Sequence, residues 1–249
     1  MPIIAWVVVF SLLGSLGVVL AAGLLLLSEE ERRRRLLASL VSYAVGTLLG
    51  AAFLGMLPRA LEGGNGRAVL STTLFGLVLF FVLEKWVLWR HCHQAECDIH
   101  SSAGPLILVG DACHNFVDGF AIASAFLASV PLGISTSLAV IAHEIPQELG
   151  DFAILLESGY TRSRALVYNL LSGATTLPGA LIAYFALSAL SAIIPYVLAV
   201  SAASFIYIAA ADLIPGLHRQ TSPRSGLQQL VLLLLGVATI SLVRLLGQN

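Results

Sequence analysis

The 249-residue chain has few charged residues: they make up 11% of the sequence, less than half of the roughly 25% found in an average soluble domain. Hydrophobic residues make up 58%, and the mean hydropathy is +0.92. No soluble core could bury this much apolar surface. Because a membrane-spanning helix needs about 20 mostly apolar residues and such runs recur along the chain, the sequence predicts one all-α, polytopic membrane domain over residues 1–249.

Cysteine is also scarce. The three cysteines, Cys92, Cys97 and Cys113, form no even set, and two of them fall in a loop that we place in the cytosol below. Structural disulfides are therefore not expected.

Breaks at charged residues, Gly and Pro divide the chain into segments of membrane-spanning length. The first run has no basic leader and is longer than the apolar part of a signal peptide, so we expect it to be retained as a helix. Short connections at 129–133 and 188–194 predict two tight antiparallel hairpins. The eight predicted spans are 3–27, 36–58, 68–90, 104–129, 131–158, 163–188, 192–216 and 226–247.

Basic residues sort to one side of these spans. Ten of the thirteen Lys and Arg residues lie in or beside the first, third, fifth and seventh connections. The three others are Arg59, Arg67 and Arg244. By the positive-inside rule, the odd-numbered connections are cytoplasmic. The sequence therefore predicts an integral protein of the plasma (inner) membrane with both termini outside.

The predicted cytoplasmic loop 91–103, between the third and fourth spans, is rich in side chains that bind metals. Its soft and borderline groups suit zinc or copper. We expect a loose, weak metal-binding segment; the alternative is a polar loop that binds no metal. The candidate ligands are His91, Cys92, His93, Cys97 and His100.

Ionisable residues occur in the middle of two predicted spans, where they cost several kcal/mol each unless they face a cavity or one another. On the fourth span they recur at i, i+3, i+4 and i+7, which is one face of a helix. The fifth span repeats this pattern. The residues are Asp111, His114, Asn115 and Asp118 on the fourth span, and His143, Glu144, Gln147, Glu148 and Asp151 on the fifth.

A tight hairpin brings these two faces together, so that five carboxylates share a volume of low dielectric constant with two imidazoles and two carboxamides. The carboxylates would repel one another, and a divalent cation bound by several N and O ligands relieves that repulsion. The alternative is a helix interface held by polar side chains, but carboxylates in this number suit such an interface poorly. The pattern therefore predicts a pathway for a divalent metal.

Three acids allow a second interpretation. Asp111 and Asp151 lie near the predicted cytoplasmic ends of their helices, where capping or solvation also explains a carboxylate. Asp212, on the seventh span, is either a ligand on the release side of the pathway or an interfacial acid close to His218 and Arg219.

Two motifs carry a resemblance to a known family. The sequences HNFVDG at 114–119 and HEIPQELGD at 143–151, on consecutive spans, resemble the paired signature of the ZIP family of zinc and iron transporters. The match is to the branch with an HEIPHELGD-type fifth helix. It extends to the eight spans, the outward termini and the His-bearing third connection.

The resemblance implies a binuclear metal centre in mid-membrane. Carried over by motif position, the first site is His114, Asp118, His143 and Gln147, and its neighbour is Asn115, Asp118 and Glu144. The resemblance further implies an alternating-access carrier that moves zinc toward the cytoplasm. In such a carrier the bundle that holds these helices moves against a scaffold that often dimerises, so a homodimer is a further expectation.

Three departures from the branch pattern bear on the site. Gln147 stands where the branch usually has His, and Thr176 stands where some binuclear members have Glu. The second span, at 50–58, lacks the Asp and His common in this branch. One main site with a weaker auxiliary site is consistent with these departures.

Parts of the pattern also fit other functions. The pair His143-Glu144 is similar to the start of the His-Glu-x-x-His motif of intramembrane zinc proteases. Gln147 replaces the second His of that motif, so we do not expect this protein to be an enzyme. A metal-selective channel and a metal-sensing receptor remain alternatives. Zinc is the expected transported substrate, and Fe²⁺, Mn²⁺ and Cd²⁺ suit the same ligands. The lipid bilayer is the expected surrounding, and no partner nucleic acid is expected.

Overall fold

A computed structural model describes residues 1–26, 28–91, 99–219 and 223–247, and all regular secondary structure in these residues is helical. Several spans combine two to four consecutive helical segments. In chain order, the elements are α1 (Ile3–Leu12), η1 (Leu13–Gly17), α2 (Val18–Leu25), α3 (Glu30–Gly50), η2 (Ala51–Met56), α4 (Leu57–Gly63), α5 (Gly66–His91), α6 (Ile99–Ala128), α7 (Val130–Glu157), α8 (Arg162–Gly173), α9 (Thr176–Ala189), η3 (Ser191–Ile193), α10 (Ile194–Tyr207), η4 (Ile208–Leu213), α11 (Ile214–His218) and α12 (Pro223–Leu246).

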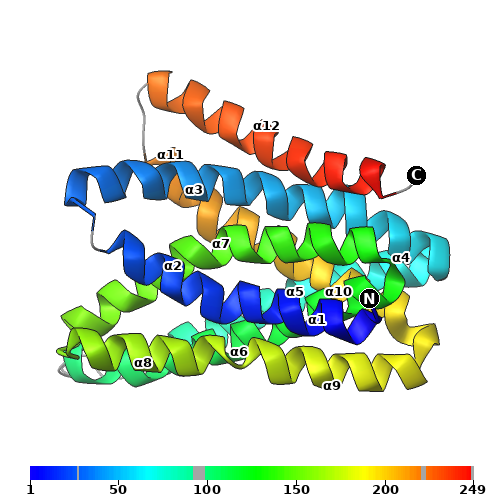
Figure 1. Ribbon diagram of the computed structural model, residues 1–249, viewed down its shortest axis with the longest axis horizontal. Helices are drawn as coiled ribbons and strands as arrows, with labels where there is room; N and C mark the ends of the chain where they lie inside the picture. Colours follow the sequence, from blue (N-terminus) through cyan, green and yellow to red (C-terminus); the bar gives the residue numbers. More distant parts are fainter. Residues whose placement is uncertain (27, 92–98, 220–222, 248–249) are drawn as a thin grey trace.

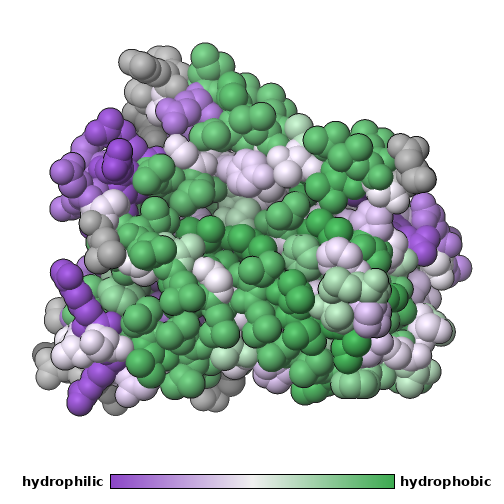
Figure 2. All heavy atoms as spheres, viewed as in Figure 1, coloured by the Kyte–Doolittle hydropathy of each residue, from purple (hydrophilic) through white to green (hydrophobic). Residues whose placement is uncertain are grey.

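Six of the helical runs among the described residues are long and apolar enough to cross a membrane. The two longest single helices, α6 with 30 residues and α7 with 28, are not among these six, and they carry the polar cluster. Figure 2 shows a broad hydrophobic band across the visible face of the molecule, with hydrophilic residues gathered toward its two ends. The band agrees with a lipid-facing surface, and the predicted all-helical membrane fold is confirmed.

The helices pack in two groups. The first group joins α1, α2, α6, α7, α8 and α9, in which α6 packs mainly against α9 and α7. The second group joins α3, α4, α5, α10 and α12, in which α3 packs mainly against α12, and α5 against α10. Contacts of α7 with α3, and of α6 with α10, connect the groups. In Figure 1, α7 lies between the α3–α12 pair and the α8–α9 pair.

Glycine allows the closest helix contacts inside each group. A Cβ added to Gly119 of α6 would lie 2.2 Å from the Thr176 carbonyl oxygen, and one added to Gly179 of α9 would lie 2.3 Å from the Phe116 carbonyl oxygen. The second group has a similarly close contact at a glycine, since a Cβ added to Gly46 of α3 would lie 2.0 Å from a backbone oxygen of α12. Small residues allow helices to approach closely in membranes, where packing stabilises association.

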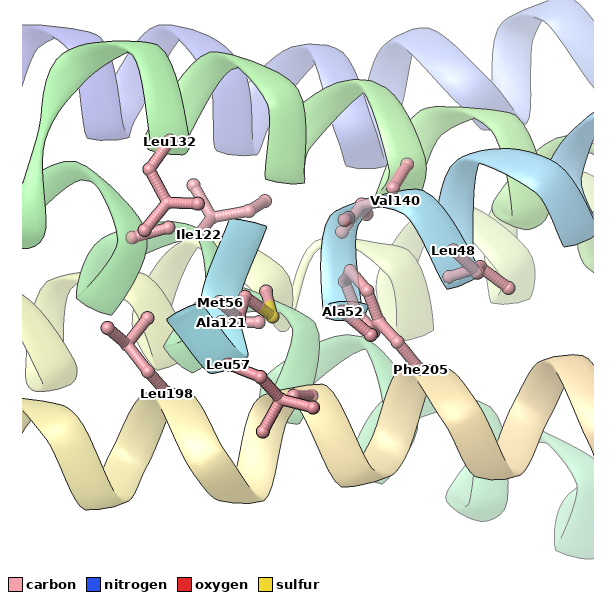
Figure 3. Close-up of a cluster of buried hydrophobic side chains, with 14 of the residues drawn as sticks. Leu48, Ala52, Met56, Leu57, Ala121, Ile122, Leu132, Val140, Leu198 and Phe205 are labelled. Atoms are coloured by element: carbon pink, nitrogen blue, oxygen red, sulfur yellow. The ribbon is translucent and has the colours of Figure 1, made fainter. Parts of the chain in front are cut away.

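The interface between the two groups is apolar. Figure 3 shows buried side chains of the second span meeting those of the fourth, fifth and seventh spans. The labelled residues are Leu48, Ala52, Met56 and Leu57 on α3 to α4, Ala121 and Ile122 on α6, Leu132 and Val140 on α7, and Leu198 and Phe205 on α10. This interface contains no described ion pair.

The turn between α6 and α7 is as short as predicted. Ser129 is the only residue between the two helices, and its hydroxyl oxygen accepts a hydrogen bond from the Leu132 amide, which caps α7. Pro131 follows in the first turn, where it costs no helical hydrogen bond. The tight cap fixes α6 and α7 as an antiparallel pair.

The two chain termini lie at the same end of the bundle (Figure 1). Arg59 of α4 holds that end together, because it pairs with Glu62 at 3.1 Å and donates a hydrogen bond to the Ala128 carbonyl at the end of α6. The first turns of α3 and α8, which carry Arg32 to Arg35 and Arg162 to Arg164, lie at the opposite end. The Arg residues at the starts of α3 and α8 therefore lie at the end of the bundle opposite the termini.

Candidate metal centre

The centre is built on the middle of α6 and α7. His114 is close to the midpoint of Ile99–Ala128, and His143 is close to the midpoint of Val130–Glu157. Because the two helices are antiparallel and begin from one shared turn, equal distances from that turn place the two histidines at the same depth. The polar faces predicted from spacing therefore meet.

Four side chains converge at this point: His114, Asp118, His143 and Glu144. The two Nε2 atoms of the histidines are 3.3 Å apart. Nε2 of His143 lies 3.2 Å from Asp118 Oδ2 and 3.5 Å from Glu144 Oε1. Nε2 of His114 lies 3.3 Å from Glu144 Oε1 and 3.9 Å from Asp118 Oδ2.

These distances match the edges of a tetrahedron around zinc. Bonds of about 2.0–2.1 Å to N and O ligands place the ligand atoms of a tetrahedral zinc site about 3.3–3.4 Å apart. Four of the five measured edges lie between 3.2 and 3.5 Å, and only the His114–Asp118 edge, at 3.9 Å, is longer. A small rotation of one side chain would close that edge.

The second nitrogen of His143 supports a role as a ligand. Nδ1 lies 2.9 Å from the Ala139 carbonyl oxygen, one turn earlier on α7. A carbonyl can only accept, so Nδ1 carries the hydrogen and the lone pair of Nε2 faces the other three side chains. Metal-binding histidines commonly donate their second N–H to a carbonyl or carboxylate in this way, which fixes the orientation of the ring.

The two carboxylates of the tetrad are buried without hydrogen-bond donors. Asp118 is 0% exposed and Glu144 is 1% exposed. Neither oxygen of either side chain accepts a hydrogen bond from the described part of the chain. Buried charge without a partner is costly, and a cation between the four side chains would satisfy it.

Gln147 and Asn115 do not point at the tetrad. The Gln147 amide donates a hydrogen bond to Asp111 Oδ1 at 3.3 Å, and the Asn115 amide donates to the same oxygen at 2.9 Å. The Asn115 Oδ1 lies 2.9 Å from the Thr176 hydroxyl, which can donate to it. The family-based set expected Gln147 with His114, Asp118 and His143, whereas the structure brings Glu144 to that fourth position.

The remaining predicted acids divide into two kinds. Asp111 and Glu148 join Glu144 in a second convergent group. Asp151 is buried on α7 beyond Glu148, and Asp212 is exposed on η4; neither belongs to a convergent group of the described residues.

The predicted loop ligands cannot be placed in the same way. In the 91–103 loop, residues 92–98, including Cys92, His93 and Cys97, lie outside the described residues, and the side chains of His91 and His100 are not described either.

Residues that the sequence patterns did not single out complete the surroundings. Phe205 of α10 packs edge-on against the His143 ring, with centroids 5.9 Å apart. Asn169 of α8 donates to the Glu148 carbonyl oxygen at 3.3 Å, and the Thr175 hydroxyl donates to the Ala112 carbonyl oxygen at 2.6 Å. Polar residues on one face of the sixth span, from Asn169 to Thr176, are the sequence pattern that could have predicted part of these surroundings. No pattern could have predicted Phe205, because an apolar residue in an apolar span is ordinary.

Known proteins of similar sequence identify the family. Residues 90–244 match the family model described as ZIP Zinc transporter. Zinc transporter ZIP13 of Pongo abelii is 35% identical over 227 residues, which cover 84% of this chain and 67% of the relative. The Drosophila melanogaster ZIP13 homolog is 30% identical over 284 residues, covering 86% and 79%. Zinc transporter ZIP10 of Mus musculus is 40% identical over 150 residues, which cover 53% of this chain but only 18% of that longer protein.

Proposed function

The chain belongs to the ZIP zinc transporter family, and we propose that it carries zinc across the membrane through the His114–Asp118–His143–Glu144 tetrad. It is an integral membrane protein that transports divalent metal. Relatives of this chain are named as zinc transporters. Zinc is the transported substrate and not a resident cofactor.

The observation that carries the proposal is the spacing of the four ligand atoms. Two imidazole nitrogens and two carboxylate oxygens lie at nearly the edge lengths of a tetrahedral zinc site, in the middle of two helices. Two of the four ligands are neutral and two are anionic, so the bound ion would leave no net charge in the membrane interior. A charge-neutral complex lowers the cost of holding a divalent ion at this depth.

Movement of the ion requires the tetrad to open to each side in turn. The two helix groups support this view, since all four ligands belong to the first group and the contact with the second group is apolar. Sliding at this interface would break no described ion pair, and the one charged contact described across it, the hydrogen bond from Arg59 to the Ala128 carbonyl, lies at the end of the bundle. We therefore propose alternating access, with the first group moving against the second; a homodimer formed by the second group would be compatible with it.

Inward transport and the membrane orientation are part of the proposal. Described Arg residues concentrate at the end of the bundle opposite the termini. The positive-inside rule places that end in the cytoplasm and both termini outside, in the plasma (inner) membrane. Zinc would then enter from the termini side and leave on the basic side.

Three alternatives are less favoured. Members of the family are transporters and not enzymes, which argues against the intramembrane protease. A channel would need a continuous open path for the ion, but three of the four tetrad side chains are buried. The relatives are named as transporters, and these names do not support a receptor that binds zinc without transporting it.

Fe²⁺, Mn²⁺ and Cd²⁺ suit the same ligand types, and we propose them as weaker substrates.

Zinc flux in proteoliposomes tests the proposal. The purified full chain should take up ⁶⁵Zn²⁺ with a rate that saturates as zinc concentration rises, and Asp118→Ala should reduce the rate to that of protein-free liposomes. A rate that rises in proportion to concentration would instead indicate a channel. Uptake by a folded Asp118→Ala protein at the rate of the unmutated chain would rule out the tetrad as the pathway.

A further inference from the structure

A cavity lies at the end of the bundle opposite the termini, where α2, α3, α7 and α8 meet. Its volume is about 340 Å³, a size typical of ligand sites in proteins. The end of α2 and the starts of α3 and α8 lie at this end (Figure 1). None of the lining residues belongs to the metal centre. They are Gly23, Leu26, Arg33, Phe152, Leu156, Arg162, Ser163 and Leu166.

Most of the cavity wall is apolar. Phe152 of α7 is buried, and the partly buried Leu26, Leu156 and Leu166 pack against its cluster. Gly23 of α2 leaves space beside them, because a Cβ added there would have only Leu166 Cδ1, at 3.7 Å, within 4 Å. Such a wall suits a hydrocarbon chain and suits a small hydrated anion poorly.

Two arginines complete the lining. Arg33 lies near the start of α3 and is partly exposed, and Arg162 is the first residue of α8 and is exposed. Neither guanidinium group forms a hydrogen bond or an ion pair with the described residues, whereas the nearby Arg35 pairs with Glu31 at 3.4 Å. The cavity therefore joins an apolar wall to two cations that have no counter-ion in the described part of the chain.

The start of α8 adds hydrogen-bond donors beside Arg162. The hydroxyl oxygen of Thr161 accepts from the Arg164 amide, and the Thr161 carbonyl accepts from the Ala165 amide. Hydrogen bonds among the described residues do not use the amides of Arg162 or Ser163. Free amides at the start of a helix favour phosphate oxygens, and the arginines and the cavity give such an oxygen a defined position.

The two arginines lie at the depth of lipid headgroups. They flank the predicted spans 36–58 and 163–188, just outside the apolar runs. A guanidinium group binds a phosphate through two parallel hydrogen bonds, and basic pockets between membrane helices bind anionic headgroups. Charge and apolar surface thus point to one class of ligand.

We propose that this cavity binds one anionic phospholipid, with its phosphate between Arg33 and Arg162 and part of an acyl chain against the apolar wall. Free phosphate would leave that wall unfilled, and a zwitterionic phospholipid brings its own cation to the arginines, so both bind more weakly. Arg33 belongs to the second helix group and the rest of the lining to the first, so the lipid contacts both groups. The inference goes beyond the proposed transport function and does not depend on it.

Native mass spectrometry of the purified, delipidated full chain tests the site. Titration with phosphatidylglycerol should give one tightly bound molecule, and phosphatidylcholine should bind more weakly. We expect Arg33→Gln and Arg162→Gln each to weaken phosphatidylglycerol binding by about 5-fold or more, the contribution of one arginine near an anionic headgroup. The matched controls, Arg32→Gln and Arg164→Gln, remove the same charge from exposed neighbours that do not line the cavity. They should bind the lipid nearly as the unmutated chain does.

Gly23→Leu tests the apolar wall separately from the charge. The added side chain would fill the space beside Leu166 and leave both arginines in place, so phosphatidylglycerol binding should fall. Gly110→Leu is the matched control, since a Cβ there meets no atom within 4 Å, and it should bind the lipid normally. Size-exclusion chromatography checks that each variant is folded. If Gly23→Leu is not, the two arginine variants, which change only exposed or partly exposed side chains, decide.

Three results would overturn the inference. Equal binding of phosphatidylcholine and phosphatidylglycerol, or equal losses in Arg33→Gln and Arg32→Gln, would show only a general attraction to the basic surface. Displacement of the lipid by inorganic phosphate at a similar concentration would make this a site for free anions. Unchanged binding in the folded arginine variants would place the lipid elsewhere. Asp118→Ala leaves the cavity intact and should bind phosphatidylglycerol normally, so failure of the transport proposal is distinguishable from failure of this one.

Discussion

The Nε2 atoms of His114 and His143 face each other at 3.3 Å across the α6–α7 contact. The rings meet edge to face, with an interplanar angle of 85°. Because Nδ1 of His143 donates its hydrogen to the Ala139 carbonyl, Nε2 of a neutral His143 carries a lone pair that faces Nε2 of His114. A divalent ion bound between the two rings would take this lone pair together with that of a His114 whose hydrogen is on Nδ1.

Removal of one imidazole should therefore abolish transport. We expect His143→Ala to lower zinc affinity and zinc flux by about 100-fold or more, since even the loss of a group that only orients a ligand costs 10- to 100-fold. ⁶⁵Zn²⁺ uptake by proteoliposomes measures the flux. His218→Ala, which removes an exposed histidine on α11, is the matched control and should transport normally. Equal flux in the two variants would contradict a role for His143 as a ligand.

Gln147→His should tighten zinc binding. Gln147 is one turn beyond His143, and its amide reaches Asp111 at the border between the two groups. An imidazole there adds a nitrogen ligand, which favours borderline zinc over harder Mn²⁺. We expect a lower KM for zinc, a higher zinc-to-manganese ratio and an equal or lower maximal rate, because a tightly held ion leaves slowly.

Competition flux of zinc against manganese measures this change. Gln228→His, at an exposed position of α12, controls for the addition of a histidine elsewhere. If KM and the metal ratio match those of the unmutated chain, position 147 does not reach the ion.

Gly119→Ala should loosen the first helix group. Its added Cβ would lie 2.2 Å from the Thr176 carbonyl oxygen, so α6 and α9 must separate. Overpacking of this kind costs about 1–3 kcal/mol, and we expect a lower Tm in detergent. Gly110→Ala on the same helix has no atom within 4 Å of the new Cβ and should leave the Tm unchanged or raise it. A Tm for Gly119→Ala at or above that of Gly110→Ala would show that the close contact is not required.

Replacement of the loop ligands should spare transport. Serine at His91, Cys92, His93, Cys97 and His100 removes every His and Cys of the predicted loop while keeping its length. The tetrad lies in the middle of α6 and α7, away from this loop in sequence, so we expect at most a few-fold change in the apparent KM for zinc. Flux assays across a zinc titration measure it. Complete loss of flux in a folded protein would show that the loop is part of the pathway.

The amino-acid sequence by itself determined the class of fold and the helix pair that carries the site. Apolar runs of spanning length predict helices because backbone groups in lipid must be paired within the segment, and residues at i, i+3, i+4 and i+7 share a face whatever lies opposite. The connection at Ser129 is too short to place α6 and α7 anywhere but side by side. These local constraints were enough to select His114, Asp118 and His143.

Only the tertiary structure decided which polar residues meet. Helical spacing gives Glu144 and Gln147 similar access to a partner helix, but the rotation of α7 against α6 directs Glu144 to the histidines and Gln147 to Asp111. That rotation is set by contacts outside the polar faces, such as Gly119 against Thr176 and the apolar contacts with the second helix group. The selection of Glu144 and the pairing of Asp111 with Glu148 depend on these packing energies, which no single helix encodes.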